Sequence, residues 1–300
     1  MSATACGAFS PSMRSSGPAE RTVARARIAL GTFVEIALPA SEATESRFAA
    51  GFDAIARIHA KMSKHDPDSD LARIARHAHR HAVDVDPETF AVLELALALW
   101  RQSGGVFDVT VARGAARGQL NALRLHRDFR VRAKVPISLD LGGIAKGHAV
   151  DKAVAALRAA GATAGHVNAG GDLRVFGASR WAPVHVRDPA APRHAVPLFD
   201  VRDFSVATSG DYFESAPTLN DPRSRRARLF GGSVTVAAPT CAIADALTKI
   251  VALDPAQAPA ILARHDAHAF RISGDRAAPR CQTTCRTSTA RLRLRPALAA

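Results

Sequence analysis

Hydrophobic and polar positions alternate in several short segments of this chain, which is the pattern of strands buried on one face. Ile137, Leu139 and Leu141 follow this pattern directly before a pair of glycines. The alternating segments predict strands near residues 26–37, 137–141, 165–169, 172–176, 182–187, 203–207, 232–237 and 267–272.

Apolar residues at helical spacing fill several of the longer segments between these strands. Asp86 and Pro87 precede one such segment and supply the start signal of a helix. The spacing predicts helices near residues 41–61, 88–103, 144–160 and 241–252, and a shorter one near 255–264.

Several of the expected strands follow one another without a helix between them, which favours antiparallel pairing. We therefore expect an α+β fold of mostly antiparallel sheets with packed helices, built as one domain or as two intertwined subdomains. Neither an internal repeat nor a linker divides residues 28–275, and segment 112–136 is expected to hold a surface loop.

The most informative stretch is DLGGIAKGHAVD at 140–151. Gly142 and Gly143 form a turn into a helix, whose free N–H groups and positive dipole end suit a phosphate. Lys146 lies in the first turn of that helix, where a cation is unfavourable unless an anion is close. These residues fit either a diphosphate site or a tight turn with a solvated lysine. The spacing matches neither a dinucleotide-binding fingerprint nor a P-loop.

Two further turns combine glycines with short polar side chains, as ligand-cradling turns do. Each of them alone would be an ordinary turn. Their residues are Asn168, Gly170, Gly171 and Asp172 in the first turn, and Ser209, Gly210 and Asp211 in the second.

The motifs of the chain, taken in order, resemble those of the FAD:protein FMN transferases, the ApbE-type flavin transferases. The resemblance covers residues 28–275, which we expect to form one flavin transferase domain. The matching segments are LGTFVEIALP (30–39), KMSKHDPDSDLARI (61–74), SGGVFDVTV (103–111), DLGGIAKGHAVD (140–151), HVNAGGDLRVFG (166–177), VATSGDYFE (206–214), GGSVTVAAP (231–239) and IADALTK (243–249).

The resemblance implies a Mg²⁺-dependent enzyme that cleaves the diphosphate of FAD. Such an enzyme moves FMN onto a Thr or Ser of an acceptor protein and releases AMP. It implies Lys146 and Asp245 as catalytic residues, and Asp245, Thr248 and the carbonyl group of Ala145 as metal ligands. It also implies an FAD pocket lined by Gly142, Gly143, Lys146, Asn168, Gly170, Gly171, Asp172, Ser209, Gly210 and Asp211.

The late helix departs from the family pattern, in which a threonine follows the aspartate by four residues. Lys249 stands at that place, and Thr248 comes one position earlier. Residues three apart are still neighbours on a helix, so Thr248 could share an ion with Asp245. The alternative is that Asp245 and Lys249 form an exposed ion pair.

A second departure concerns the base that would deprotonate the acceptor hydroxyl. The family histidine before the Asp-Pro-Arg turn is replaced by Thr218 in TLNDPRSR at 218–225. Threonine is no base near neutral pH, whereas histidine is. The chain could therefore bind or hydrolyse FAD with weak or no transfer. His65 is the candidate substitute base, with an ordinary surface-loop histidine as the alternative.

The net charge of +13 would suggest nucleic acid or a membrane if it were spread over the chain. It is concentrated at the ends, because residues 276–300 hold six arginines and no acid, and residues 1–27 hold four arginines and one glutamate. We expect residues 1–27 and 276–300 to be disordered; a shifted reading frame is another explanation for the second segment. With 5% aromatic residues, a nucleic-acid partner is not expected.

No run of about 18 apolar residues occurs, so no transmembrane segment is expected. Residues 1–27 also lack the apolar core of a signal peptide. The chain as written is expected to be cytoplasmic, whereas a different start site would make a periplasmic or membrane-associated protein the expectation.

Overall fold

The computed structural model describes most of the chain, with gaps. The described residues are 21–110, 119–177, 181–189, 191, 193–210, 219–223, 226–228, 231–273, 281–283 and 289–295. Asp211 and Thr218, two residues singled out from the sequence, lie outside them. No helix in this part of the chain is both long enough and apolar enough to cross a membrane.

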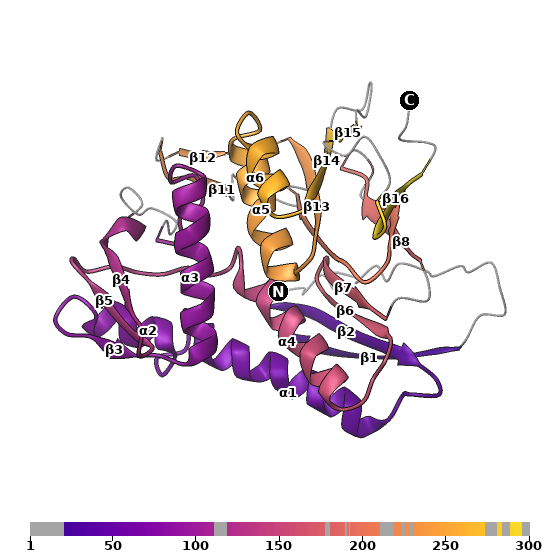
Figure 1. Cartoon of the computed structure of the whole chain (residues 1–300), viewed down its shortest axis with the longest axis horizontal. Helices are drawn as coiled ribbons and strands as arrows, with labels where there is room; N and C mark the ends of the chain where they lie inside the picture. The colour runs from indigo at the N-terminus through magenta and orange to yellow at the C-terminus, as the bar shows by residue number, and fades with distance from the viewer. Residues whose placement is uncertain are drawn as a thin grey trace, which may run out of the picture.

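Within the described residues, an eight-stranded sheet forms the centre of the fold (Figure 1). All neighbouring strands in it run antiparallel. In spatial order the strands are β1 (Thr22–Ala29), β2 (Thr32–Pro39), β6 (Gly165–Ala169), β7 (Asp172–Phe176), β10 (Ser205–Gly210), β13 (Gly232–Ala238), β14 (His268–Ser273) and β15 (Cys281–Thr283).

Three smaller sheets accompany the large one in the described part of the chain. Their strands are β16 (Leu292–Leu294), β9 (Ala195–Val201) and β8 (Ala182–Arg187) in the first, β3 (Val83–Asp84), β5 (Arg130–Ala133) and β4 (Leu123–His126) in the second, and β11 (Leu219–Asp221) with β12 (Arg226–Arg228) in the third.

Several of the helices begin at a polar side chain that caps them. The side chains of Ser69, Asp86 and Thr240 each accept a hydrogen bond from a backbone N–H group in the first turn of their helix. The predicted start at Asp86 and Pro87 is therefore confirmed. The helices are α1 (Glu45–Met62), α2 (Asp70–His77), α3 (Pro87–Gln102), α4 (Ala145–Ala159), α5 (Cys241–Leu253) and α6 (Ala258–Arg264), with a 3₁₀ turn at Leu120–Ala122.

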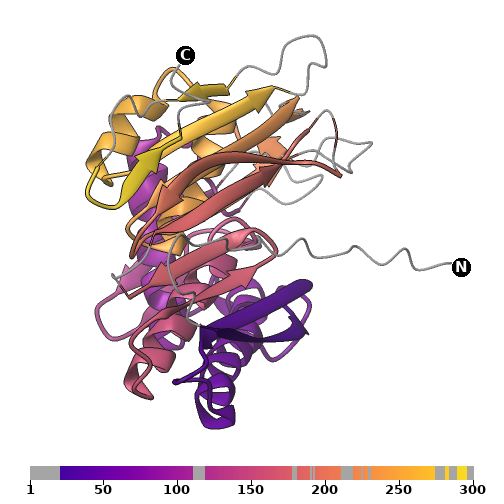
Figure 2. The same ribbon diagram turned by 90° about the vertical axis from the view of Figure 1, so that its right-hand side faces the viewer.

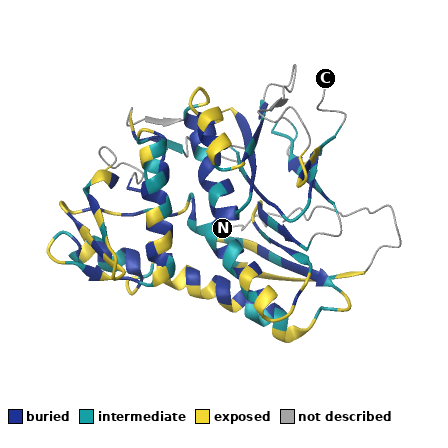
Figure 3. Ribbon diagram, viewed as in Figure 1, coloured by how far each residue is buried: buried dark blue, intermediate teal, exposed yellow. Residues whose placement is uncertain are grey.

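Two hydrophobic cores lie on opposite faces of the large sheet. The first core joins α1, α3, α4 and α5 to one face, and α4 packs between α1 and α5 (Figure 2). The second core joins the other face to β8 and β9. In β13, Val236 contributes to the first core and its neighbour Ala237 to the second, since successive strand residues point to opposite faces. All of β13 is buried, as the dark central strands of Figure 3 show.

Segment 137–141 differs from its prediction, because it forms no strand. Ile137, Leu139 and Leu141 are buried as the alternation predicts. The segment runs as a connection into α4, and the backbone N–H group of Asp140 donates to the carbonyl oxygen of Val109 at 2.7 Å. Alternating burial therefore arises here without the ladder of hydrogen bonds that defines a strand.

Two other predictions need correction, and some elements were not predicted. The expected strand at 26–37 is a hairpin of β1 and β2, which turns at Leu30 and Gly31 with positive φ angles of 54° and 71°. The expected surface loop at 112–136 contains β4 and β5, which bury Leu123 and Val131. Neither α2 nor β9 is among the predicted elements.

The structure places three strands at least partly in the segments that were expected to be disordered. β1 begins at Thr22, within the expected N-terminal tail. Strand β15 pairs with β14, and β16 pairs with β9 in the second core. Leu292 of β16 is fully buried there, so the sequence of the tail includes a residue of the core.

Leu292→Ala is expected to destabilise the fold by about 2–3 kcal/mol, toward the low end for such substitutions because β16 lies at a sheet edge. Urea unfolding of the full chain measures the loss. Leu294→Ala is the matched control on the same strand, because Leu294 is only partly buried and should cost less. Equal stability of the Leu292 variant and the wild type would show that β16 adds nothing to the second core.

Candidate active site

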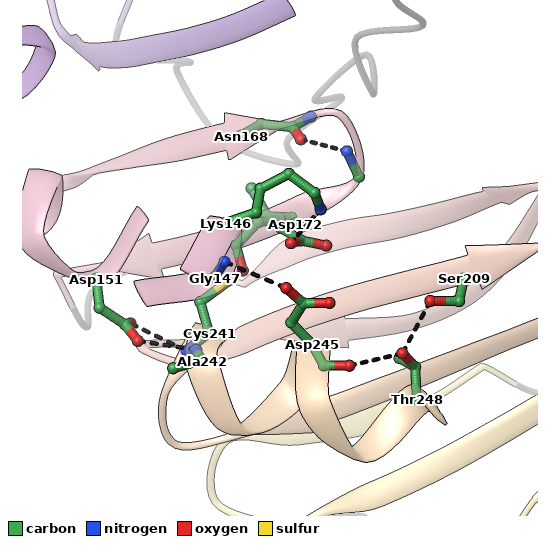
Figure 4. Close-up of polar contacts among 12 residues, drawn as sticks. Lys146, Gly147, Asp151, Asn168, Asp172, Ser209, Cys241, Ala242, Asp245 and Thr248 are labelled. Carbon is green, nitrogen blue, oxygen red and sulfur yellow. Dashed lines mark hydrogen bonds and ion pairs between the residues drawn. The ribbon is translucent and has the colours of Figure 1, made fainter. Parts of the chain in front are cut away.

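Four charged side chains meet where α4 begins and where α5 passes the end of β10. The ammonium group of Lys146, in the first turn of α4, pairs with Asp172 at the start of β7. The ammonium group of Lys249 lies 2.5 Å from Oδ1 of Asp245, one turn earlier in α5. Both carboxylates are 1% exposed, whereas the two lysines retain 26% and 21%. Figure 4 shows Lys146 and Asp172 on one side of the cluster and Asp245 on the other.

The four charges influence one another because they are buried together. Burial and the neighbouring charge of Asp245 raise the pKa of Asp172 to about 7, despite the ion pair with Lys146. Burial would also raise the pKa of Asp245, but the charges of Lys249 and Lys146 outweigh it and lower that pKa. Burial disfavours the charged form of Lys146, yet Asp172 and Asp245 raise its pKa above the usual value. Both lysines therefore face carboxylates, and Lys146 is charged.

Two hydroxyl groups complete the cluster. Oγ1 of Thr248 donates to the backbone carbonyl oxygen of Asp245 at 2.7 Å, and it lies 2.8 Å from Oγ of Ser209. Since a threonine hydroxyl has one proton, Ser209 donates to Thr248 in this arrangement. Ser209 lies near the end of β10, so this hydroxyl pair ties the large sheet to α5 (Figure 4).

The glycine turn before α4 lies against this cluster. A Cβ atom on Gly143 would lie 3.2 Å from Cε of Lys249, so the glycine leaves room for the lysine stem. The N–H group of Gly142 donates to Oδ1 of Asp140 at 2.9 Å, as in a tight Asx turn. The other carboxylate oxygen of Asp140 accepts from Lys64 at 2.7 Å, which brings the loop after α1 to the same turn.

Helices α4 and α5 cross in close backbone contact at Gly147. A Cβ atom there would lie 2.6 Å from the carbonyl carbon of Cys241 and 2.8 Å from the backbone nitrogen of Ala242. The carboxylate of Asp151, one turn later in α4, accepts hydrogen bonds from the backbone N–H groups of Cys241 and Ala242, both at 2.9 Å. The carboxylate of Asp245 in turn accepts from the N–H group of Gly147 at 3.4 Å. Each helix thus places an aspartate at the positive N-terminal end of the other.

The turn between β6 and β7 depends on its glycines. Gly170 and Gly171 have φ angles of 59° and 102°, which residues with a side chain rarely adopt. Oδ1 of Asn168 accepts from the N–H group of Gly171 at 3.0 Å. Asp172 follows at once, so this turn delivers the carboxylate that pairs with Lys146.

A profile of the ApbE family matches residues 30–271 of the chain. The chain belongs to the ApbE family. This family member is 27% identical over 232 residues to the FAD:protein FMN transferase of Vibrio cholerae serotype O1, covering 63% of this chain and 68% of that one. It is 31% identical over 238 residues to the FAD:protein FMN transferase of Treponema pallidum (strain Nichols), covering 64% of this chain and 65% of that one. It therefore spans about two thirds of each relative.

Solved structures share the fold of this ApbE family member. The ApbE protein of Thermotoga maritima superimposes with a TM-score of 0.76 at 25% identity, covering 87% of this chain and 96% of that one. The flavin transferase ApbE of Vibrio cholerae gives a TM-score of 0.74 at 20% identity, covering 88% and 97%. The predicted family, the α+β fold with antiparallel sheets and the expectation of an enzyme are thereby confirmed.

The structure of this ApbE family member brings most of the predicted site residues together. Lys146 is not a solvated lysine, because it is paired with a buried carboxylate. The pair of Asp245 and Lys249 exists, but it is buried and not exposed as the alternative supposed. Ala145 is the first residue of α4. Gly210 ends β10 beside Ser209.

His65 is exposed in the loop after α1. Its backbone N–H group donates to Oγ of Ser63 at 3.3 Å, while the neighbouring Lys64 contacts Asp140 at the glycine turn. His65 is therefore placed as an ordinary surface-loop histidine, which was the alternative to a substitute base.

Two residues of the site were missed by the sequence reasoning. Gly147 interrupts a helical pattern, and such an isolated glycine often marks close packing, so a signal was present. Asp151 gave no such signal, because the N–H groups that it caps lie 90 and 91 residues away in the sequence.

Gly147→Ala is expected to destabilise this family member by about 1–3 kcal/mol, since the added methyl group meets backbone atoms that cannot rotate away. Thermal and urea unfolding measure the change. Gly51→Ala in α1 is the matched control, because its Cβ atom would meet only side-chain atoms of Ile36 and Leu157. A smaller loss at residue 147 than at residue 51 would contradict the close crossing of α4 and α5.

The ligands expected for Mg²⁺ on α5 already have other partners. Carboxylate and hydroxyl oxygens such as those of Asp245 and Thr248 suit magnesium in kind. In the arrangement described, however, the Lys249 ammonium group already contacts the carboxylate, and the Thr248 hydroxyl oxygen already accepts a hydrogen bond from Ser209 at 2.8 Å. These residues therefore do not fit a divalent ion bound to Asp245 as they stand, and Mg²⁺ stays a prediction from the resemblance.

Proposed function

We propose that this chain transfers FMN from FAD to a Thr or Ser of an acceptor protein and releases AMP. The observation that carries the proposal is the buried cluster of Lys146, Asp172, Asp245 and Lys249 at the glycine turn that opens α4. Family membership and the two transferases that are similar to it in sequence support the same reaction.

The reaction needs positive charge beside a diphosphate. In the proposed complex the diphosphate of FAD lies at the turn of Gly142 and Gly143, where Lys146 and Lys249 offset the negative charge that develops on the leaving phosphate. Asp172 and Asp245 hold the two ammonium groups in place. Because the lysines are fixed before the nucleotide arrives, little reorganisation accompanies the reaction.

The transfer is a substitution at phosphorus. The acceptor hydroxyl oxygen forms a bond to the phosphorus on the FMN side of the diphosphate. The bond from that phosphorus to the bridging oxygen breaks, and AMP leaves with this oxygen. The hydroxyl proton passes to a base, which the family histidine would supply and Thr218 cannot.

The direct test incubates the purified chain with FAD and a flavin-free acceptor domain, with and without Mg²⁺. The acceptor is one that natively carries FMN on a threonine through a phosphoester bond. Intact mass spectrometry should show that the acceptor gains one FMN, with AMP released in equal amount. An acceptor with no native attachment site is the control and should keep its mass. Absence of both products in both conditions, with and without Mg²⁺, would refute the proposal.

A second candidate is hydrolysis of FAD by water, and the threonine at residue 218 favours it. In the same mixture without an acceptor, this activity would release FMN and AMP together, as chromatography would detect. Release that continues at the same rate when the acceptor is present, without any gain in its mass, would favour hydrolysis over transfer.

A further inference from the structure

The ammonium group of Lys249 lies in a nest of three oxygens. Its Nζ atom is 2.5 Å from Oδ1 of Asp245, 3.1 Å from the backbone carbonyl oxygen of Asp245 and 3.1 Å from Oγ of Ser209. A lysine ammonium group has three N–H donors. Each donor therefore has an oxygen partner, and the group is bound as a small cation would be.

The surroundings hold the ammonium group at this position. Asp245 is 1% exposed and Thr248 is fully buried, so the nest is closed on the side of α5. A Cβ atom on Gly143 would lie 3.2 Å from Cε of Lys249, so a larger residue there would press on the methylene stem. The stem of Lys249 leaves α5 and passes beside the glycine turn, where the diphosphate is proposed to lie.

The oxygens of the nest are those that a hard divalent cation would use, namely a carboxylate, a carbonyl group and a hydroxyl group. One position cannot hold an ammonium group and a divalent cation together, because both need the same carboxylate oxygen and the two charges repel each other.

We propose that the Lys249 ammonium group is the resident cation of this site, tethered to the chain in place of a metal ion. Flavin nucleotide binding therefore does not require a divalent cation, and the free protein binds such cations poorly at Asp245. The identity of the nucleotide rests on the proposed function, whereas the exclusion of the metal from Asp245 does not.

The first experiment measures Mn²⁺ binding to the nucleotide-free full chain by electron paramagnetic resonance. Lys249→Thr frees the carboxylate and should bind Mn²⁺ at least about tenfold more tightly than the wild type. Lys249→Met, which frees the carboxylate without adding a hydroxyl group, should gain affinity as well, and circular dichroism checks that each variant is folded. Lys152→Thr is the matched control, since this lysine pairs with Glu88 away from the nest, and it should behave as the wild type.

The second experiment measures FAD binding by calorimetry in EDTA and in Mg²⁺. The wild type should bind FAD equally well in both, whereas Lys249→Thr should lose at least about tenfold in FAD affinity in EDTA and recover that affinity in Mg²⁺. The proposal of a tethered cation would be overturned if the wild type bound Mn²⁺ as tightly as the Lys249 variants do. It would also be overturned if EDTA weakened FAD binding by the wild type. Absence of FAD binding under all conditions would instead refute the proposed function, and the Mn²⁺ comparison would still decide the role of Lys249.

Discussion

Asp245→Asn is expected to reduce FMN transfer to background and to destabilise the fold by about 3–5 kcal/mol. The substitution keeps the shape of the side chain but removes the charge that lies 2.5 Å from the Lys249 ammonium group. Two lysines would then share the single carboxylate of Asp172 in a buried place. Single-turnover transfer and urea unfolding measure the two effects.

A second variant separates folding from function. Asp245→Asn combined with Lys249→Met removes both charges of the pair and should recover most of the lost stability, because no ammonium group is left without its partner. Transfer should remain at background. Asp128→Asn is the control for a surface pair with Arg130, and it should change neither quantity. Unchanged stability of the Asp245 single variant would show that the buried pair is not energetically coupled.

Thr218→His is expected to raise the rate of FMN transfer by ~10²–10⁴-fold, the usual contribution of a well-placed general base. The prediction follows from the sequence, since Thr218 lies outside the described residues. Threonine keeps its proton near neutral pH, whereas a histidine with a pKa near ~6.5 can accept one from the acceptor hydroxyl.

The pH profile identifies the new base. A histidine must be neutral to accept a proton, so the rate of the variant should rise as the pH increases through about 6.5 and then level off. Single-turnover transfer from pH 5.5 to 8.5 measures it, and Thr218→Asn is the matched control without a base. A fast wild type that gains nothing from the histidine would show that another group already serves, and His65→Ala would then be the next variant.

The sequence predicted the long helices from their apolar periodicity, and a capping side chain supports the start of some of them. Asp86 before α3 is one example and Thr240 before α5 is another. It failed where local pattern does not determine pairing. Segment 137–141 has the burial of a strand without a partner, and β16 is a three-residue strand whose place depends on β9, about 90 residues earlier. Leu30 with its positive φ gave no turn signal, because glycine or asparagine usually marks such turns.

The site was predictable in its parts but not in its connections. The glycine turn follows from the spacing of its residues, whereas Asp245 and Thr248 were predicted from the resemblance to the family, and spacing shows only that they are neighbours on a helix. The partner of Lys146 does not, because Asp172 is 26 residues away and meets it only through the packing of α4 on the sheet. The burial of Lys249 was also hidden, since an aspartate and a lysine four residues apart usually form a surface pair.

The backbone contact at Gly147 gives the site a mechanical character. Helices α4 and α5 touch through main-chain atoms there, so neither can slide past the other without a backbone collision. Lys146 and Asp245 therefore keep a fixed spacing, and a nucleotide bound as proposed would have to match it. Adjustment on binding falls to surface connections, such as the one that joins Lys64 to Asp140 by a half-exposed ion pair. The charged centre of this protein is thus held rigidly between α4 and α5, and it does not form by closure of one helix onto the other.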